Sequence, residues 1–219
     1  MRGLIIKDFL NLKRQVIPML MFLIVYFFIS LLTMDSSFFA GVIIIFGSML
    51  PISALSYDDK AGFAKYALTL PVSRNTLVIS KYVMSLILLL SASILAFINN
   101  LLIGKMDILE NMAAVTLIMA VGCVIVSISL PSIFKFGVEK GRFIMIGIIM
   151  LGGFFGTFAC LSISGGNIAM LYDDNGFGFT LNDSFFSGSQ LYISVLVLSI
   201  LIFLLSMSIS IAIYRKKDF

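Results

Sequence analysis

The chain has 219 residues, of which 60% are apolar and only 12% are charged, and its mean hydropathy is +1.13. Soluble domains are about half apolar and about a quarter charged, so this composition excludes a soluble enzyme or binding domain and predicts an integral membrane protein. In a membrane protein, basic residues first indicate how the chain is oriented across the bilayer. The net charge of +4 therefore predicts no nucleic-acid partner.

The first residues predict an amphipathic helix that lies at the membrane surface and leads into the first span. Apolar residues recur here at helical spacing, and the basic residues face away from them, toward anionic lipid. We interpret residues 1–15 as this elbow helix. The apolar stripe is formed by Ile5, Phe9, Leu12 and Val16. The elbow residues that we single out are Lys7, Phe9, Lys13 and Arg14.

Charge-poor stretches long enough to cross a bilayer as helices occur six times along the chain, since a crossing needs about 20 apolar residues. The sequence therefore predicts an all-α integral membrane protein, with six transmembrane helices in one domain over residues 1–219. The expected spans are about 16–34, 37–56, 76–104, 111–134, 143–166 and 189–214. The longest connection, about 167–188, is expected to be extracellular.

The placement of basic residues predicts which side of the membrane holds the chain ends. With six spans, both ends lie on the same side, and every Lys and Arg except Lys105 falls on that side. Because cytoplasmic segments collect Lys and Arg, we expect both termini to be cytoplasmic in a multi-pass protein.

One short charged stretch, "SYDDKAGFAKYALTLPVSR" from Ser56 to Arg74, interrupts the apolar sequence. It contains an apolar stripe at helical spacing, which predicts a cytoplasmic helix over about 57–70 between the second and third spans. The stripe consists of Phe63, Tyr66, Ala67 and Leu70.

Capping signals bound this predicted helix. Ser56 with Asp59 three residues later resembles a capping box at its start, and Asp58 also suits the positive end of a helix dipole. Pro71 ends the helix, and Ser73 is placed to cap the third span.

Two interpretations of this helix remain open. In the first, it is an interfacial connector whose aromatic side chains lie among lipid headgroups. In the second, it docks a soluble partner, with Phe63 and Tyr66 as aromatic anchors surrounded by charges.

Missing residues exclude several classes of chemistry. The chain has no histidine, the commonest general base and metal ligand, and only two cysteines, so we expect no catalytic residue and no metal site. We find no charge away from the ends of the predicted spans, which disfavours a carrier driven by an ion gradient. No G-x-x-x-x-G-K-S/T phosphate loop is present, so if ATP drives this protein another chain must bind it.

The stretch "SYDDKAGFAKYALTLPVSRNTLVISKY", together with the six spans and the elbow, resembles the membrane permease subunits of bacterial ABC type-2 (ABC-2) exporters. Among these it is similar to the permeases that export phenol-soluble modulins and to peptide-resistance permeases. The resemblance implies a non-enzymatic subunit in the bacterial plasma membrane, exporting an amphipathic or hydrophobic substrate such as a peptide.

The same resemblance implies partners. Two permease halves, either identical or sister chains, would pair about a pathway, and each would dock on a cytoplasmic ABC ATPase that binds ATP and Mg. The helix after the second span would be the coupling helix that contacts this ATPase. Its contact residues would be Asp58, Asp59, Lys60, Phe63, Lys65, Tyr66, Leu70 and Arg74.

Gly152 and Gly156 form a G-x-x-x-G in the fifth span, a spacing that allows close helix approach and suggests a contact between the halves. The alternative function, from a different class, is a membrane immunity or assembly protein that binds a peptide or partner without transporting it.

Overall fold

The computed structural model describes residues 2–34, 37–63, 66, 73–103, 108–163, 172–173, 176–177 and 189–216. Side chains from 152 onward are described only for residues 193–216. The described helices are α1 (Arg2–Thr33), α2 (Ser37–Lys60), α4 (Arg74–Ile103), α5 (Ile108–Phe136), α6 (Val138–Ile163) and α8 (Ser189–Arg215). Two short strands, β1 (Tyr172–Asp173) and β2 (Gly176–Phe177), pair antiparallel.

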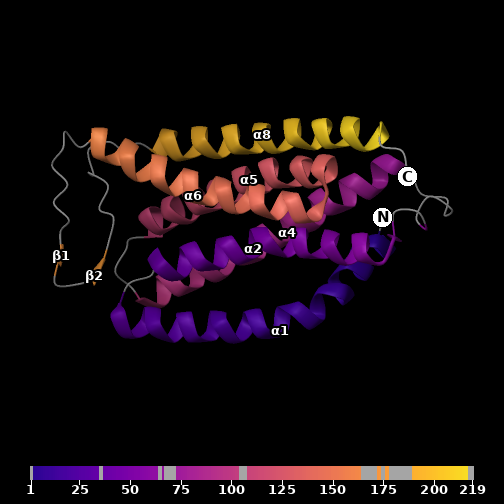
Figure 1. Cartoon of the computed structure of the whole chain (residues 1–219). Helices are drawn as coiled ribbons and strands as arrows, with labels where there is room; N and C mark the ends of the chain where they lie inside the picture. Colours follow the sequence, from indigo (N-terminus) through magenta and orange to yellow (C-terminus); the bar gives the residue numbers. More distant parts are fainter. Residues whose placement is uncertain are drawn as a thin grey trace.

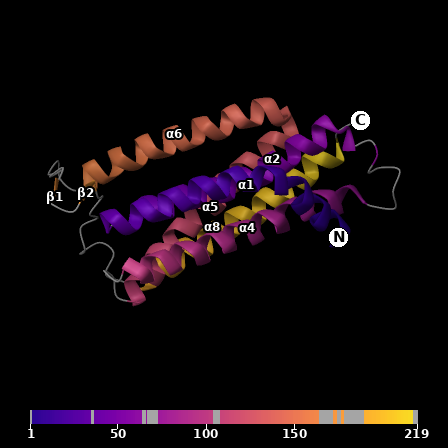
Figure 2. The same ribbon diagram turned by 90° about the horizontal axis from the view of Figure 1, so that it is seen from below.

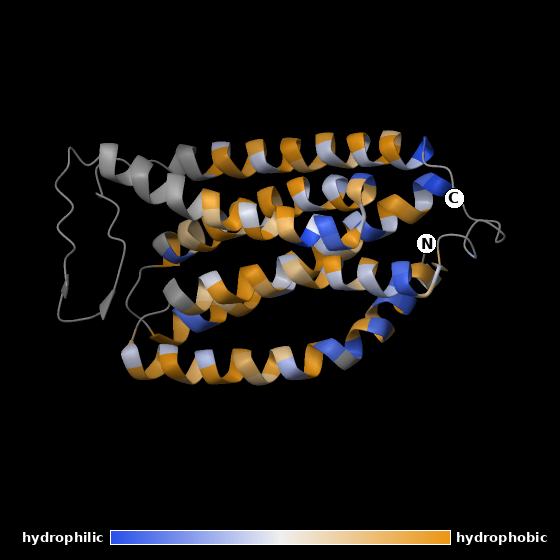
Figure 3. Ribbon diagram, viewed as in Figure 1, coloured by the Kyte–Doolittle hydropathy of each residue, from blue (hydrophilic) through white to orange (hydrophobic). Residues whose placement is uncertain are grey.

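The helices run up and down between two ends of an elongated bundle (Figure 1). Both chain termini lie at one end, which we call the termini end, together with the end of α2 and the start of α4. Seen from below, α6 lies at one edge of the bundle, while α4 and α8 lie side by side at the other (Figure 2). Hydrophobic residues cover the helices along most of their length, and hydrophilic residues gather toward the helix ends (Figure 3).

Within the described part of the chain, five helices are long and apolar enough to cross a membrane: Gln15–Thr33, Phe39–Lys60, Arg74–Ile103, Asn111–Phe136 and Ile193–Arg215. The chain is therefore an all-α, multi-pass membrane protein. The predicted fifth span, 143–166, overlaps α6, part of whose side chains lie outside the described residues, so the count of six spans stays a prediction.

The predicted elbow over residues 1–15 is not a separate helix. One continuous helix, α1, runs from Arg2 to Thr33, because no proline precedes Pro18 and nothing else in this segment breaks a helix. The buried face also differs from the predicted stripe. Asp8 and Leu12 are buried, whereas Phe9 is exposed. The start of α1 therefore packs on α2 and α4.

The second span also ends later than predicted. Helix α2 continues through Ser56 and Asp58 to Lys60, so Ser56 and Asp59 do not form a capping box at the start of a new helix. The amide of Ala61 still donates to the Tyr57 carbonyl at 3.0 Å, and the chain then turns at Gly62, whose φ of 61° favours glycine. Residues 64, 65 and 67–70 of the predicted helix over 57–70 lie outside the described residues.

The start of α4 confirms one capping prediction. The Thr76 amide donates to Ser73 Oγ at 3.3 Å, and α4 begins at the next residue, Arg74.

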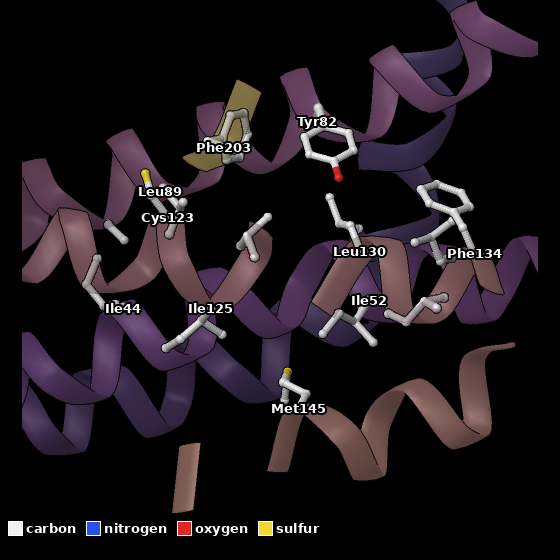
Figure 4. Close-up of a cluster of buried hydrophobic side chains, with 14 of the residues drawn as sticks. Ile44, Ile52, Tyr82, Leu89, Cys123, Ile125, Leu130, Phe134, Met145 and Phe203 are labelled. Atoms are coloured by element: carbon white, nitrogen blue, oxygen red, sulfur yellow. The ribbon is translucent and has the colours of Figure 1, made fainter. Parts of the chain in front are cut away.

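The hydrophobic core lies among α2, α4, α5 and α8 (Figure 4). At its centre, Gly122 of α5 has no room for a side chain, because an added Cβ would lie 2.8 Å from Leu89 of α4 and 3.2 Å from Ile44 of α2. This glycine lets α5 approach α2 and α4 closely.

Candidate functional site at the termini end

Four charged side chains from three helices meet near the termini end, and we call them the ion cluster. Lys81 of α4 contacts Asp8 of α1 at 2.7 Å and Asp58 of α2 at 2.5 Å. Lys7 of α1 contacts the other oxygen of Asp58 at 2.6 Å. The exposed fractions of the four side chains are 1% for Asp8, 8% for Lys81, 12% for Asp58 and 28% for Lys7. Two cations thus balance two carboxylates inside the bundle.

Lys81 is the centre of this cluster because it donates to both carboxylates. Moving charges out of water costs several kcal/mol for each ion, and pairing offsets that cost only where the geometry is good. Asp8 depends most on Lys81, because Asp8 Oδ1 accepts no hydrogen bond from the described residues, although Lys7 Nζ lies 3.4 Å away. The cluster therefore holds α1, α2 and α4 together only while all four members are present.

Apolar packing continues the same contact further along the helices. Leu12, one turn after Asp8, is buried against Ala54 of α2 and Met84 of α4. Another turn on, Gln15 Nε2 donates to Ser53 Oγ at 2.9 Å. The charged contact therefore lies at the end of a longer helix interface.

The ion cluster also reaches the segment that follows α2. Lys7 Nζ lies 3.3 Å from the centre of the Phe63 ring, in cation–π contact. The Phe63 ring in turn lies 6.4 Å from the Tyr66 ring, centre to centre. A side chain near the start of α1 thus touches one of the two aromatic residues predicted to contact a partner.

A pocket of about 90 Å³ lies beside the cluster. Asp58, Asp59 and Lys81 provide charged groups to its wall, and Phe63 contributes a ring. Apolar side chains from the ends of α4, α5, α6 and α8 complete it, namely Leu77, Ile133, Phe134, Val138 and Tyr214. The described helices that end or begin here, except α1, therefore all contribute to its wall.

On α4, the residue after Lys81 makes a second buried polar contact. The Tyr82 hydroxyl lies 2.7 Å from Ser206 Oγ and 2.7 Å from Ser210 Oγ, both on α8. Ser206 in turn donates to the Ser127 carbonyl of α5. Since each hydroxyl has one proton, Tyr82 donates to Ser206 and accepts from Ser210. The Tyr82 ring also packs edge-on against Phe203 at 5.1 Å, and Figure 4 shows both rings in the core.

The structure separates the predicted ATPase-contact residues. Asp58 is a buried member of the ion cluster and lies in the last turn of α2, facing two lysines, while its contact with an ATPase stays a prediction. Asp59, Lys60 and Tyr66 are exposed near the turn. Arg74 donates to the Arg215 carbonyl at 3.0 Å. Lys65 and Leu70 lie outside the described residues.

The remaining predicted site residues lie on α1 and α6. Lys13 and Phe9 are exposed on α1, whereas Lys7 is paired with Asp58 instead of facing lipid. The side chain of Arg14 lies outside the described residues. Gly152 and Gly156 fall in the helical backbone of α6, but their surroundings lie outside the described part of the chain, so the contact between halves stays a prediction.

Sequence reasoning missed Asp8 and Lys81 as members of a site. Lys81 lies in the second turn of α4, near the start of the predicted span, but it is buried in the bundle. A signal was present: a lysine flanked by Val78, Ile79, Tyr82 and Val83 needs a carboxylate partner if that helix is buried. Asp8 is the only acidic residue of the N-terminal segment and was available for that role.

A family model described as ABC-2 family transporter protein matches residues 3–215. This range includes nearly all of every described helix and all four members of the ion cluster. No curated protein and no solved structure matches the chain.

Proposed function

The chain belongs to the ABC-2 transporter family, and we propose that it is the membrane subunit of an ATP-driven exporter whose ATPase is a separate chain. Membership of this family makes it a membrane-embedded transport permease and implies an ATPase partner. The lack of a phosphate loop and of histidine in the sequence supports a permease that does not itself hydrolyse ATP.

The observation that carries the proposal is the contact between the ion cluster and Phe63. Lys7 binds Asp58 and also covers Phe63, so the segment after α2 is tied to α1 directly and to α4 through Lys81. A partner that pushes on this segment would act on three membrane helices at once. Exposed Asp59 and Lys60 supply the charged surroundings that such a contact needs.

In the proposed cycle, ATP binding closes two ATPase subunits and moves the segment between α2 and α4. The attached helices then rock as a body and open the pathway outward, and hydrolysis of ATP, with its Mg, resets them. A second permease half, identical or a sister chain, lies across the pathway. Both termini are cytoplasmic in this arrangement, in a bacterial plasma membrane, which fits their common end in Figure 1 and the basic residues there.

The proposed substrate is an amphipathic or hydrophobic peptide of the kind represented by phenol-soluble modulins and antimicrobial peptides. The 21 Phe and 13 Met residues support it, because flexible and aromatic side chains adapt to varied apolar ligands. Such a peptide partitions into the inner leaflet and would enter laterally between the halves.

The test is copurification of an ATPase with the detergent-solubilised permease. We expect the double variant Phe63→Ala with Tyr66→Ala to lose the ATPase at least about tenfold, because aromatic anchors dominate docking energies. A matched control is Leu109→Ala with Met112→Ala, which removes two exposed apolar side chains at the opposite end of the bundle.

If the wild-type chain binds no ATPase, the proposal fails, and the membrane immunity or assembly function gains support. If the double alanine variant retains the ATPase, docking takes place elsewhere on the chain. Asp59→Lys is the charge-reversal variant to add, since Asp58 is committed to the ion cluster.

A further inference from the structure

Two neighbouring residues of α4, Lys81 and Tyr82, contact different sets of helices. Lys81 binds Asp8 of α1 and Asp58 of α2, while Tyr82 binds Ser206 and Ser210 of α8. Consecutive residues of a helix project about 100° apart, so one turn of α4 faces both sets. In this turn, consecutive residues join the ion cluster to the hydroxyl network of Tyr82, Ser206 and Ser210.

The contacts of Lys81 and of Tyr82 are both buried, which protects their hydrogen bonds from exchange with water. Tyr82, Ser210 and Asp8 are exposed by no more than 1%, so water does not replace their hydrogen bonds when the helices move. In the hydroxyl network, the Ser127 carbonyl accepts from Ser206, Ser206 from Tyr82, and Tyr82 from Ser210. Each proton in this chain has a single acceptor, which fixes the position of α8 relative to α4.

A second contact joins the start of α4 to the end of α8. Arg74 donates to the Arg215 carbonyl at 3.0 Å, and Arg215 Nε donates to Asn75 Oδ1 at 2.9 Å. The start of α4 and the end of α8 are thus held at two levels, roughly two turns apart on α4. Two separated contacts resist both sliding and rotation of one helix against the other.

We propose that Lys81 and Tyr82 make α4 the helix that transmits movement from α1 and α2 to α8. Lys81 receives the movement through the ion cluster, and Tyr82 passes it on through the hydroxyl network. Both are positioning residues, since neither touches substrate or nucleotide in this scheme. The inference rests on the proposed function, because it assumes an ATPase that acts on the segment after α2.

The test compares helix positions in two nucleotide states. In a background without Cys123 and Cys160, spin labels are placed at Lys13→Cys on α1 and Lys216→Cys at the end of α8, both exposed positions. The α1 to α8 distance is measured in the permease–ATPase complex, free of nucleotide and trapped with ATP and vanadate. We expect the distance to stay constant in the wild-type background.

The same distance is then measured in Tyr82→Phe, which removes the hydroxyl but keeps the ring that packs on Phe203. We expect the distance to differ between the two nucleotide states in this variant, because the polar contact of Arg215 with Arg74 and Asn75 is then left alone to hold α8 on α4, and one such contact does not resist rotation. Ser206→Ala with Ser210→Ala should have the same effect, and adding Tyr82→Phe to it should change nothing more. Ser208→Ala is the matched control, since Ser208 is exposed and donates to the Leu204 carbonyl of its own helix.

Transport gives a second readout, with a fluorescently labelled amphipathic helical peptide as the probe in proteoliposomes. One buried hydrogen bond is worth about 0.5–1.5 kcal/mol, so Tyr82→Phe should lower peptide transported per ATP hydrolysed by about threefold to tenfold. ATPase copurification should match that of Ser208→Ala. A merely structural role for Tyr82 would lower stability without changing this ratio.

A distance that changes in the wild type, or that stays constant in Tyr82→Phe, overturns the inference while leaving the proposed function intact. Failure of the wild-type complex to bind an ATPase overturns the proposed function instead. Because Tyr82→Phe deletes a single oxygen and keeps the core packing, it avoids the folding defect that a variant of Lys81 would bring.

Discussion

Helix α4 is tied to α1 at two places by opposite chemistry. Near the termini end the tie is ionic, from Lys81 to Asp8. Near the opposite end it is neutral, from Asn99 Nδ2 to Ser30 Oγ at 3.0 Å. There Asn100 also donates to Asn111 of α5 at 2.8 Å, and we call these three asparagines with Ser30 the amide cluster. Both clusters are buried.

The two clusters differ in how completely their members depend on one another. The ion cluster is balanced only as a set of four, so losing one member leaves an uncompensated charge. In the amide cluster, Asn99 Oδ1 and Asn100 Oδ1 already accept no hydrogen bond from the described residues. A neutral cluster that tolerates unpaired atoms separates at modest cost, whereas the ionic one resists separation. The comparison therefore predicts that α4 is held strongly at the termini end and weakly at the opposite end.

The largest effect should follow from Lys81→Met. This change leaves two buried carboxylates facing one lysine, so we expect a loss of about 3–5 kcal/mol in the free energy of unfolding, measured by denaturant titration in mixed micelles. Lys13→Met on exposed α1 surface is the control and should change it by less than about 0.5 kcal/mol.

Adding Asp8→Asn to Lys81→Met removes the net charge that the single variant creates. The double variant should recover at least about 1 kcal/mol, because contacting residues couple by that order. If it is no more stable than Lys81→Met alone, the ion cluster does not act as a balanced set.

A smaller effect should follow from Asn111→Ala at the other end. The variant leaves Asn100 Nδ2 without its acceptor and removes the donor to the Phe97 carbonyl at 3.4 Å. We expect a loss of about 1–2 kcal/mol in the free energy of unfolding by the same titration, since the variant leaves no unpaired charge in the core. Asn11→Ala, at an exposed position of α1, serves for comparison. A loss as large as that for Lys81→Met would erase the distinction between the two ends.

The smallest effect should follow from Ser73→Ala, which removes the cap of α4 at the termini end. The cap is exposed, and its loss should lower the free energy of unfolding by about 0.5–1 kcal/mol. Ser91→Ala, an exposed serine within the same helix, is the reference and should show almost no change. An effect larger than that of Lys81→Met would mean that α4 is held at this end by its cap more than by the ion cluster.

The sequence predicted what depends on local pattern. Long apolar stretches predicted the helices, because a span must satisfy its own backbone hydrogen bonds. Ser73 was recognised as a cap because capping needs only a side chain and an amide three residues later. Each of these features is determined within about one helix, so no knowledge of neighbours was needed.

The site depended on contacts between distant residues, and here local rules failed. Asp58 and Asp59 suited the positive start of a helix, yet they lie at the negative end of α2. Lys7 and Lys81 offset this unfavourable placement of Asp58, and they come from other helices. Helical periodicity gives the face on which a residue lies, but it does not identify the residue across from it. Asp8 and Lys81 are 73 positions apart in sequence.

The order of the ion cluster along the chain has a consequence for biogenesis. During synthesis Lys7, Asp8 and Asp58 leave the ribosome first, and together they carry a net negative charge. Lys81 follows 23 residues after Asp58, so the set becomes neutral only once the start of α4 has emerged. Until then, Asp8 and Asp58 remain in water, because burying them unpaired is too costly. Helices α1 and α2 therefore enter the bilayer with their charged ends apart, and α4 is the segment whose insertion closes them together.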